Sequence, residues 1–113
     1  MTRQYYVYIM TNAHNTVLYT GVTNDLLRQV WHHRHGQGSE FTAKYRCTKL
    51  VFYELYKDSY NAIAREKQIK AGSRKVKLKL VERMNSEWRD LYDQCNGRGL
   101  DAPDCFGRYA PSQ

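Results

Sequence analysis

Two short runs of aromatic and β-branched residues near the N-terminus have the pattern of β-strands. Residues 5–10 form the first run, and residues 16–20 form the second after a stretch rich in turn-forming residues. We therefore predict a hairpin whose second strand ends at Gly21. Side chains alternate between the two faces of a strand. Symmetric pairing about the turn is expected to place Tyr8 opposite Tyr19, with both phenols on one face of the sheet.

A helix is predicted directly after the hairpin. Asp25 closes a run of short oxygen-bearing residues that suit a helix N-cap, and the helical pattern continues to about His35. The spacing of its apolar residues predicts that the helix buries Leu27, Val30 and Trp31.

The rest of the chain predicts a third strand and further helices. Residues 39–48 have neither a helical nor a strand period and are expected to form a loop or short turn, whereas residues 50–55 are predicted to be a strand. Helices are predicted at 59–71 and 74–84, with a last short one at 85–92. The predicted fold class is α/β (α+β): a small three-stranded, largely antiparallel sheet flanked by about four helices.

The periodic pattern stops near residue 93. Glycine and proline punctuate the remaining residues, so we predict one domain at 1–93 and a flexible C-terminal tail at 94–113. The three cysteines lack Cys-x-x-Cys spacing and are expected to be buried or incidental thiols. No apolar run approaches the roughly 20 residues of a membrane helix, and no secretory signal is recognisable, which favours a cytoplasmic location.

Charge points towards a polyanionic partner. The chain has 18 Lys and Arg against 11 Asp and Glu, a net charge of +7, and much of the excess lies in residues 65–83. Such a field favours nucleic acid. The alternative for a single basic run is a solvated helix face. Ten tyrosines beside this charge favour nucleic acid, because aromatic rings can stack on bases or hydrogen-bond to phosphate.

One carboxylate falls on an apolar helix face. In the helix predicted at 59–71, Glu66 lies three residues from both Ile63 and Ile69, which places it on the expected core side. A carboxylate there is costly unless it is paired with a cation or holds a metal ion. Two interpretations stay open: an ion pair with a nearby Arg or Lys, or a ligand for a hard divalent cation.

The ordered set of motifs resembles a known nuclease family. Tyr6-Val7-Tyr8 and Tyr19-Thr20-Gly21 resemble paired GIY and YIG elements, and the segments 64–70 and 85–91 match further family elements in the same order. Over roughly residues 4–93 the chain resembles the GIY-YIG nuclease superfamily. It is most similar to the small single-domain bacterial branch, which is related to the N-terminal domain of the excinuclease C subunit.

The resemblance implies a metal-dependent DNA endonuclease that hydrolyses phosphodiesters and serves DNA repair. The two motif tyrosines of the family fall on Tyr8 and Tyr19, its metal-binding glutamate on Glu66, and its supporting asparagine on Asn85. A phenol, whose pKa is ordinarily about 10, acts as a general base only where cations lower that pKa. The expected cofactor is Mg²⁺ or Mn²⁺, which would neutralise charge on the scissile phosphate and the leaving oxygen.

The chain departs from the family at Gln29. The family has a catalytic arginine ten residues after the tyrosine of the second motif, and glutamine offers neither the permanent charge nor the phosphate-matched fork of arginine. Arg28 lies about 100° away around the helix, so it is not an obvious replacement; Arg34 and Lys44 are other candidates. His33 lies one turn after position 29 and is expected to contact phosphate or assist proton transfer.

The expected partner is duplex or branched DNA, without a membrane or an obligate protein partner. Gly21 is expected to let the backbone approach a phosphate closely, although a bulge or strand end would also explain a glycine there. The other expected DNA contacts are basic: Arg28, Arg65, Lys67, Lys70, Arg74 and Lys75.

Other function classes remain as alternatives. A non-catalytic nucleic-acid-binding module on the same fold is favoured by Gln29, whereas the joint presence of Tyr8, Tyr19, Glu66 and Asn85 favours the nuclease. A protein-interaction module would explain the tyrosines but not the charge. A small-molecule enzyme is disfavoured, because the chain has no phosphate-cradling glycine-rich loop and no nucleophile elbow.

Overall fold

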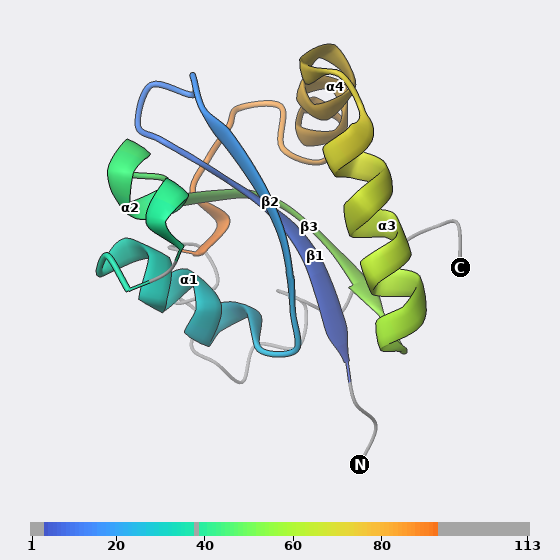
Figure 1. Ribbon diagram of the computed structural model, residues 1–113. Coiled ribbons are helices and arrows are strands. Elements are labelled where there is room, and N and C mark those ends of the chain that lie inside the picture. Colours follow the sequence, from blue (N-terminus) through green and yellow to red (C-terminus); the bar gives the residue numbers. More distant parts are fainter. Residues whose placement is uncertain (1–3, 38, 93–113) are drawn as a thin grey trace.

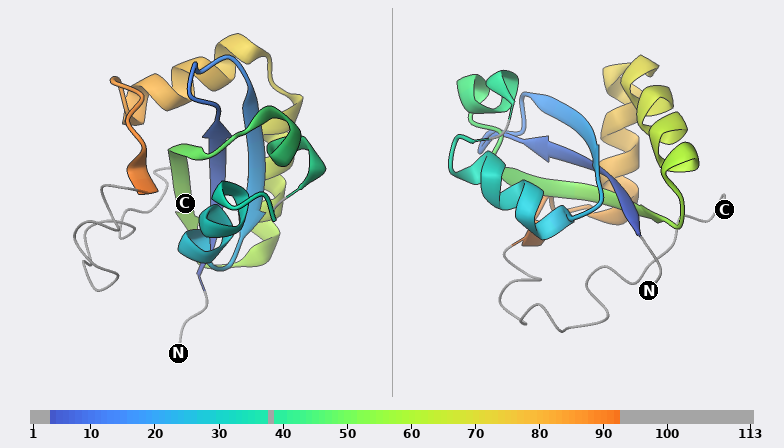
Figure 2. Two further views of the ribbon diagram at one scale, coloured as in Figure 1. Left: turned by 90° about the vertical axis from the view of Figure 1, so that its left-hand side faces the viewer. Right: turned by 60° about the horizontal axis from the view of Figure 1, so that its bottom comes forward.

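The computed structural model describes residues 4–37 and 39–92, which fold into an antiparallel sheet with helices on both faces (Figure 1). The strand order is β2-β1-β3. Helices α1 and α2 cover one face, and α3 and α4 cover the other (Figure 2). The predicted fold class is confirmed over the described residues, whose elements are β1 Tyr5–Thr11, β2 Leu18–Thr23, α1 Leu26–Arg34, α2 Glu40–Tyr45, β3 Lys49–Tyr56, α3 Ser59–Ala71 and α4 Arg74–Met84.

The register of the hairpin differs from the prediction by two residues. Tyr8 pairs with Gly21, and Tyr19 pairs with Met10, so the two tyrosines are diagonal neighbours rather than directly opposite. The cause is a wider turn, which the Asn12 side chain organises by accepting hydrogen bonds from the backbone N–H groups of residues 16 and 17. A shift of two residues preserves the face. Strand β2 also continues past Gly21 instead of ending there.

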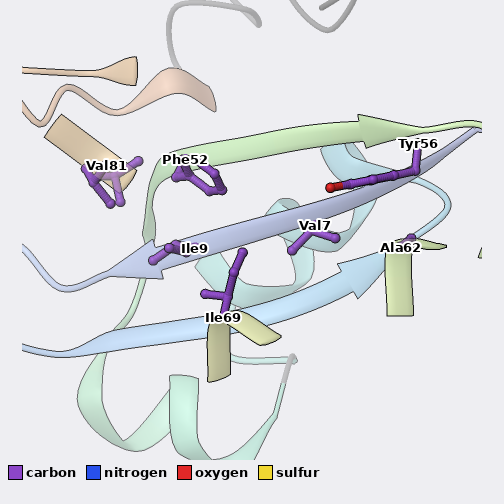
Figure 3. Close-up of a cluster of buried hydrophobic side chains, with 8 residues drawn as sticks. Val7, Ile9, Phe52, Tyr56, Ala62, Ile69 and Val81 are labelled. Atoms are coloured by element: carbon purple, nitrogen blue, oxygen red, sulfur yellow. The ribbon is translucent and has the colours of Figure 1, made fainter. Parts of the chain in front are cut away.

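The face beneath α3 and α4 carries an aliphatic core. Val7 and Ile9 of β1 project towards Ala62 and Ile69 of α3 and towards Val81 of α4, all of them buried (Figure 3). Burial of such side chains stabilises the fold by about 1.5–3 kcal/mol for each large aliphatic residue. The prediction that Ile63 also belongs to this core is wrong: its side chain is 42% exposed.

The opposite face is covered by α1, whose buried stripe differs from the predicted one. The helix buries Leu26, Val30 and His33, whereas Trp31 is 42% exposed and Leu27 is only partly buried. Asp25 caps the helix, so its first turn begins at Leu26, and spacings of four and three residues direct the buried side chains towards the sheet. The polar His33 therefore occupies the core position that had been predicted for a tryptophan.

Two segments have a local structure other than the predicted one. The predicted loop at 39–48 contains helix α2, which Ser39 caps by accepting a hydrogen bond from the N–H of Thr42. The predicted helix at 85–92 is absent over 85–90. There the chain makes a turn, and Trp88 has a φ of +56°, which is incompatible with a helix.

Some predictions fall on residues outside the described ranges. The tail predicted at 94–113 lies there, as do Cys95 and Cys105. Cys47 is fully buried, which agrees with the prediction of buried or incidental thiols. Among the described residues, no helix is long and apolar enough to cross a bilayer.

Candidate active site

The Tyr8 phenol lies directly across the backbone of its strand partner Gly21. A Cβ added at position 21 would lie 2.5 Å from the Tyr8 hydroxyl oxygen and 2.6 Å from its ring carbon Cζ, far inside van der Waals contact. Only glycine therefore fits beneath this ring. On this face the tyrosine fills the space that the sequence had assigned to a phosphate, so the glycine shapes the site by admitting Tyr8.

Gly21→Ala is expected to lower the free energy of unfolding by about 1–3 kcal/mol, the usual cost of overpacking a core. The methyl group would displace the Tyr8 ring from its hydrogen bond. Urea denaturation measures the change, with Gly72→Ala as the matched control, because a Cβ at Gly72 would keep 3.3 Å from its nearest atom, the Ile69 carbonyl oxygen. Equal stability losses in the two variants would contradict this explanation of Gly21.

A buried chain of hydrogen bonds joins Tyr8 to helix α2. The Tyr8 hydroxyl lies 3.0 Å from His33 Nε2, and His33 Nδ1 lies 2.9 Å from Thr42 Oγ1. The Thr42 hydroxyl donates to the carbonyl of Ser39, so its oxygen accepts from His33 Nδ1–H. This arrangement assigns the proton of the neutral imidazole to Nδ1. The unprotonated Nε2 then accepts the Tyr8 hydroxyl proton.

Burial shifts the pKa values of this pair in opposite directions. Loss of solvent raises the pKa of Tyr8 above its usual range, the neighbouring Tyr19 and the negative charge of Glu66 raise it further, and a hydrogen bond from Gln29 lowers it in part. Burial and the neighbouring His32 lower the pKa of His33. Both groups are therefore neutral at pH 7, and the proton rests on the phenol.

The lowered pKa of His33 predicts a pH-dependent stability. The unfolded chain takes up a proton near pH 6.5, whereas the folded chain resists it, so the free energy of unfolding is expected to fall as pH decreases below about 6.5. Urea denaturation between pH 5 and 8 measures the slope. His33→Asn should make it shallower, and His14→Asn, on the exposed hairpin turn, should leave it unchanged. Identical slopes in all three proteins would contradict the assignment.

Tyr19 completes an aromatic cluster with the same two side chains. Its ring centroid lies 6.4 Å from that of Tyr8 and 5.5 Å from that of His33. The prediction that both tyrosines share one sheet face is confirmed. Tyr19 is partly exposed, whereas the rings of Tyr8 and His33 are almost fully buried. The cluster therefore meets solvent at Tyr19.

Position 29 projects into this cluster. Gln29 Nε2 lies 3.5 Å from His33 Nε2, and the same amide hydrogen-bonds to the Tyr8 hydroxyl. Arg28 is exposed and shares with Gln29 a hollow of about 500 Å³. Arg34 is engaged elsewhere, through an ion pair of 2.7 Å with Asp90. A longer cationic side chain at position 29 would therefore reach the phenol directly.

Glu66 has a cationic neighbour, contrary to what the metal-ligand interpretation predicted. Its carboxylate lies 2.8 Å from Lys70 Nζ, one helical turn along α3. The glutamate side chain is 13% exposed and the lysine 51% exposed, so this is a solvent-screened pair rather than a buried one. The charge of Glu66 nevertheless reaches Tyr8 and raises its pKa. This effect is the smallest of the causes that act on Tyr8, and Lys70 is the neighbour that directly contacts the carboxylate.

Asn85 lies outside the tyrosine cluster. Its buried amide donates to the backbone carbonyls of Val51 and Arg89 and accepts from the Arg89 N–H. These bonds pin the end of α4 and the following turn to β3, the strand at the opposite edge of the sheet from β2. These hydrogen bonds of Asn85 are made with the scaffold rather than with Tyr8, Tyr19 or His33.

Comparison with known proteins agrees with this arrangement. A family model described as "GIY-YIG catalytic domain" matches residues 4–79. The chain belongs to the GIY-YIG catalytic domain family. It is 36% identical over 78 residues to a UPF0213 protein of Staphylococcus saprophyticus, covering 69% of this chain and 94% of that one. It is 37% identical over 79 residues to a UPF0213 protein of Staphylococcus haemolyticus, covering 70% and 95%.

A solved structure supports the same assignment of this GIY-YIG domain. The solution NMR structure of a UPF0213 protein from Bacillus halodurans is 27% identical, covers 80% of this chain and 95% of that one, and superposes with a TM-score of 0.51. The similar proteins are thus UPF0213 proteins, and the more distant relation to the excinuclease C subunit stays a prediction.

The basic residues expected to bind DNA divide into engaged and exposed groups. Arg65 is held by Glu54 through Nε at 2.9 Å and Nη2 at 3.2 Å, and this pairing raises the pKa of the guanidinium. Arg74 reaches a backbone carbonyl of the hairpin turn. Lys67 and Lys75 are exposed. Their helices cover the sheet face opposite α1 (Figure 2).

Sequence reasoning missed Thr42, the GIY-YIG domain residue that orients His33. Thr42 is fully buried although it lies on the otherwise exposed helix α2. The available signal was Ser39, because serine is a preferred N-cap residue, but no local pattern indicated that Thr42 would contact His33.

Proposed function

We propose that this GIY-YIG domain is a metal-dependent DNA endonuclease whose hydrolytic activity is impaired by Gln29. The observation that carries the proposal is the buried hydrogen bond between the Tyr8 hydroxyl and His33 Nε2, with the side chain of residue 29 against both groups. A phenol that donates its hydrogen bond to an unprotonated imidazole can pass a proton to it. The partly exposed Tyr19 lies between Tyr8 and the solvent.

The proton path supports a general-base role for Tyr8. As an attacking water loses its proton to the phenol oxygen, the phenol proton passes to His33 Nε2, and the Thr42 hydroxyl holds the imidazole in the required tautomer. Burial opposes the first step, because it raises the pKa of Tyr8 and lowers that of His33. A positive charge beside the site would favour the reaction by stabilising the hydroxide and the negative charge that develops on the phosphate.

Glu66 is the residue proposed to hold the metal ion. Mg²⁺ in phosphoryl-transfer sites is often bound by one or two carboxylates together with substrate phosphates and water, so a single protein carboxylate suffices. The described residues contain no cluster of three or more His, Cys, Asp or Glu, so Glu66 would be the proposed protein ligand and the remaining ligands would come from phosphate and water. When bound, Mg²⁺ or Mn²⁺ would neutralise negative charge on the scissile phosphate. Lys70 would have to release the carboxylate first.

The second candidate is a nucleic-acid-binding module without catalysis. Gln29 supplies no charge to Tyr8, and the ion pair with Lys70 occupies the carboxylate of Glu66; both observations favour binding without cleavage. The exposed lysines Lys67 and Lys75 could contact phosphate in a nuclease and in a binding module alike.

A cleavage assay separates the two candidates. Branched, nicked and single-stranded DNA are incubated with Mg²⁺ or Mn²⁺ and either the natural chain or its Gln29→Arg variant. Weak cleavage by the natural chain and faster cleavage by the variant support an impaired nuclease. Binding of DNA without cleavage by either protein, in both metals, supports the binding module.

A further inference from the structure

Helix α2 leaves two large aromatic side chains partly exposed to solvent. Phe41 and Tyr45 are each 42% exposed, and Thr42 is the only buried residue of this short helix. Thr42 anchors α2 to α1 through its hydrogen bond to His33. Aromatic surface left in water lowers solubility and is usually associated with binding.

These rings continue the aromatic cluster of the candidate site. Phe41 stacks on Tyr19 with ring centroids 5.9 Å apart and an angle of 30° between the planes, and Tyr45 lies 4.8 Å beyond Phe41. Tyr19 in turn contacts Tyr8 and His33. An unbroken row of rings therefore runs from the proposed proton path outward along α2. Helix α2 lies on the α1 side of the sheet (Figure 1).

Positive charge accompanies the row. Lys44 Nζ lies 5.4 Å from the centre of the Tyr45 ring, and Arg46, with a left-handed φ of 55°, follows directly and is exposed. Tyr45 and Arg46 also line a hollow of about 640 Å³ between α2 and the hairpin turn, where His33 contributes to the wall. This volume falls within the range of roughly 300–1,000 Å³ that is usual for small-ligand pockets.

We propose that Phe41 and Tyr45, with Lys44 and Arg46 beside them, form a stacking platform for unpaired nucleobases next to the scissile phosphate. Exposed rings interleaved with cations are the features that bind single strands: bases stack on the rings, and phosphates pair with the cations. Bases within a duplex already stack on one another and cannot use such a surface. The inference rests on the proposed function and names its substrate class, a strand with unpaired bases at the cleavage point.

Binding measured without cleavage tests the platform. A short fluorescein-labelled thymidine oligonucleotide and a duplex of equal length are titrated in EDTA and followed by fluorescence anisotropy. The Phe41→Leu/Tyr45→Leu variant keeps apolar bulk but loses both rings. We expect it to bind the oligonucleotide at least tenfold more weakly, equivalent to about 1.4 kcal/mol, with less than a twofold change for the duplex.

Matched controls separate stacking from folding. Tyr60 on α3 is 80% exposed and lies outside the platform, so Tyr60→Leu should leave both affinities unchanged. Circular dichroism and the melting temperature establish that each variant is folded. A thymidine oligonucleotide containing one 2-aminopurine gives a direct signature, because stacking on a ring should quench its fluorescence in the natural chain and less in the double-leucine variant.

Several results would overturn the platform. These are equal affinities of the natural and double-leucine proteins for the oligonucleotide, no binding by the natural chain, or equal losses for oligonucleotide and duplex. A change from dimer to monomer in the double-leucine variant without a change in binding would assign the rings to self-association instead. Ring-dependent binding together with a Gln29→Arg variant that cuts no DNA would refute the nuclease while leaving the platform in place.

Discussion

Gln29→Arg is expected to raise the rate of DNA cleavage at least tenfold. The glutamine amide already lies against Tyr8 and His33, so an arginine from the same helical position would bring a permanent charge to the phenol and to the scissile phosphate. The charge would lower the pKa of Tyr8, which burial now raises, and would stabilise the developing negative charge. Loss of one such contact typically lowers the rate by a factor on the order of 10²–10³. A tenfold gain in the Gln29→Arg variant is therefore a modest expectation.

Two matched variants show whether the gain in cleavage rate requires the planar guanidinium of arginine and whether it requires position 29. Gln29→Lys supplies charge without the planar fork and should recover less activity. Arg28→Gln in the Gln29→Arg background should lower the rate much less than the return to glutamine at position 29, because Arg28 is exposed and its loss would remove only one expected contact with DNA. The pH profile of the restored protein should extend to lower pH as the pKa of Tyr8 falls. Full activity in the natural chain, or none in the restored one, would contradict this role of position 29.

Glu66→Ala in the Gln29→Arg background is expected to abolish metal-dependent cleavage while barely changing stability. The carboxylate is the proposed metal ligand, but its structural partner Lys70 is half exposed. Exposed pairs one helical turn apart contribute only about 0.3–0.5 kcal/mol, so thermal unfolding should shift little. Cleavage is measured across a range of Mg²⁺ and Mn²⁺ concentrations, because removal of the ligand should abolish cleavage even at concentrations that saturate the Gln29→Arg protein.

Two control variants separate charge, ion pairing and metal binding at this position. Lys70→Ala breaks the same ion pair from the other side and frees the carboxylate, so cleavage should be retained at saturating DNA, where the loss of one expected phosphate contact is compensated. Glu82→Ala removes an exposed carboxylate from α4 and should have no effect. A stability loss of about 3–5 kcal/mol in Glu66→Ala, the usual cost of breaking a buried pair, would assign Glu66 to the scaffold. If Lys70→Ala and Glu66→Ala lost cleavage equally, Glu66 would likewise be assigned to the scaffold.

Periodicity alone determined the three strands and the helices α1, α3 and α4. Helices α3 and α4 begin and end at the predicted residues, because Asp58 and Ser73 cap their first turns and their apolar stripes repeat at the helical period. The common face of Tyr8 and Tyr19 was also predictable, since alternation along a strand survives a register shift of two residues. The glutamine in place of the family's catalytic arginine was predictable too, because position 29 lies ten residues after Tyr19 in the sequence.

Only the tertiary structure decided the contacts that turn these residues into a site. The pairing of Tyr8 with Gly21 depends on the turn that Asn12 organises. The side-chain hydrogen bonds of Asn12 cannot be predicted from the hydrophobic period of the strands. The burial of His33 in place of Trp31 depends on how α1 rests on the sheet. The partner that orients His33 comes from α2, because folding brings Thr42 against an imidazole nine residues away. Local sequence patterns report spacing along one element, whereas these contacts arise where separate elements pack together.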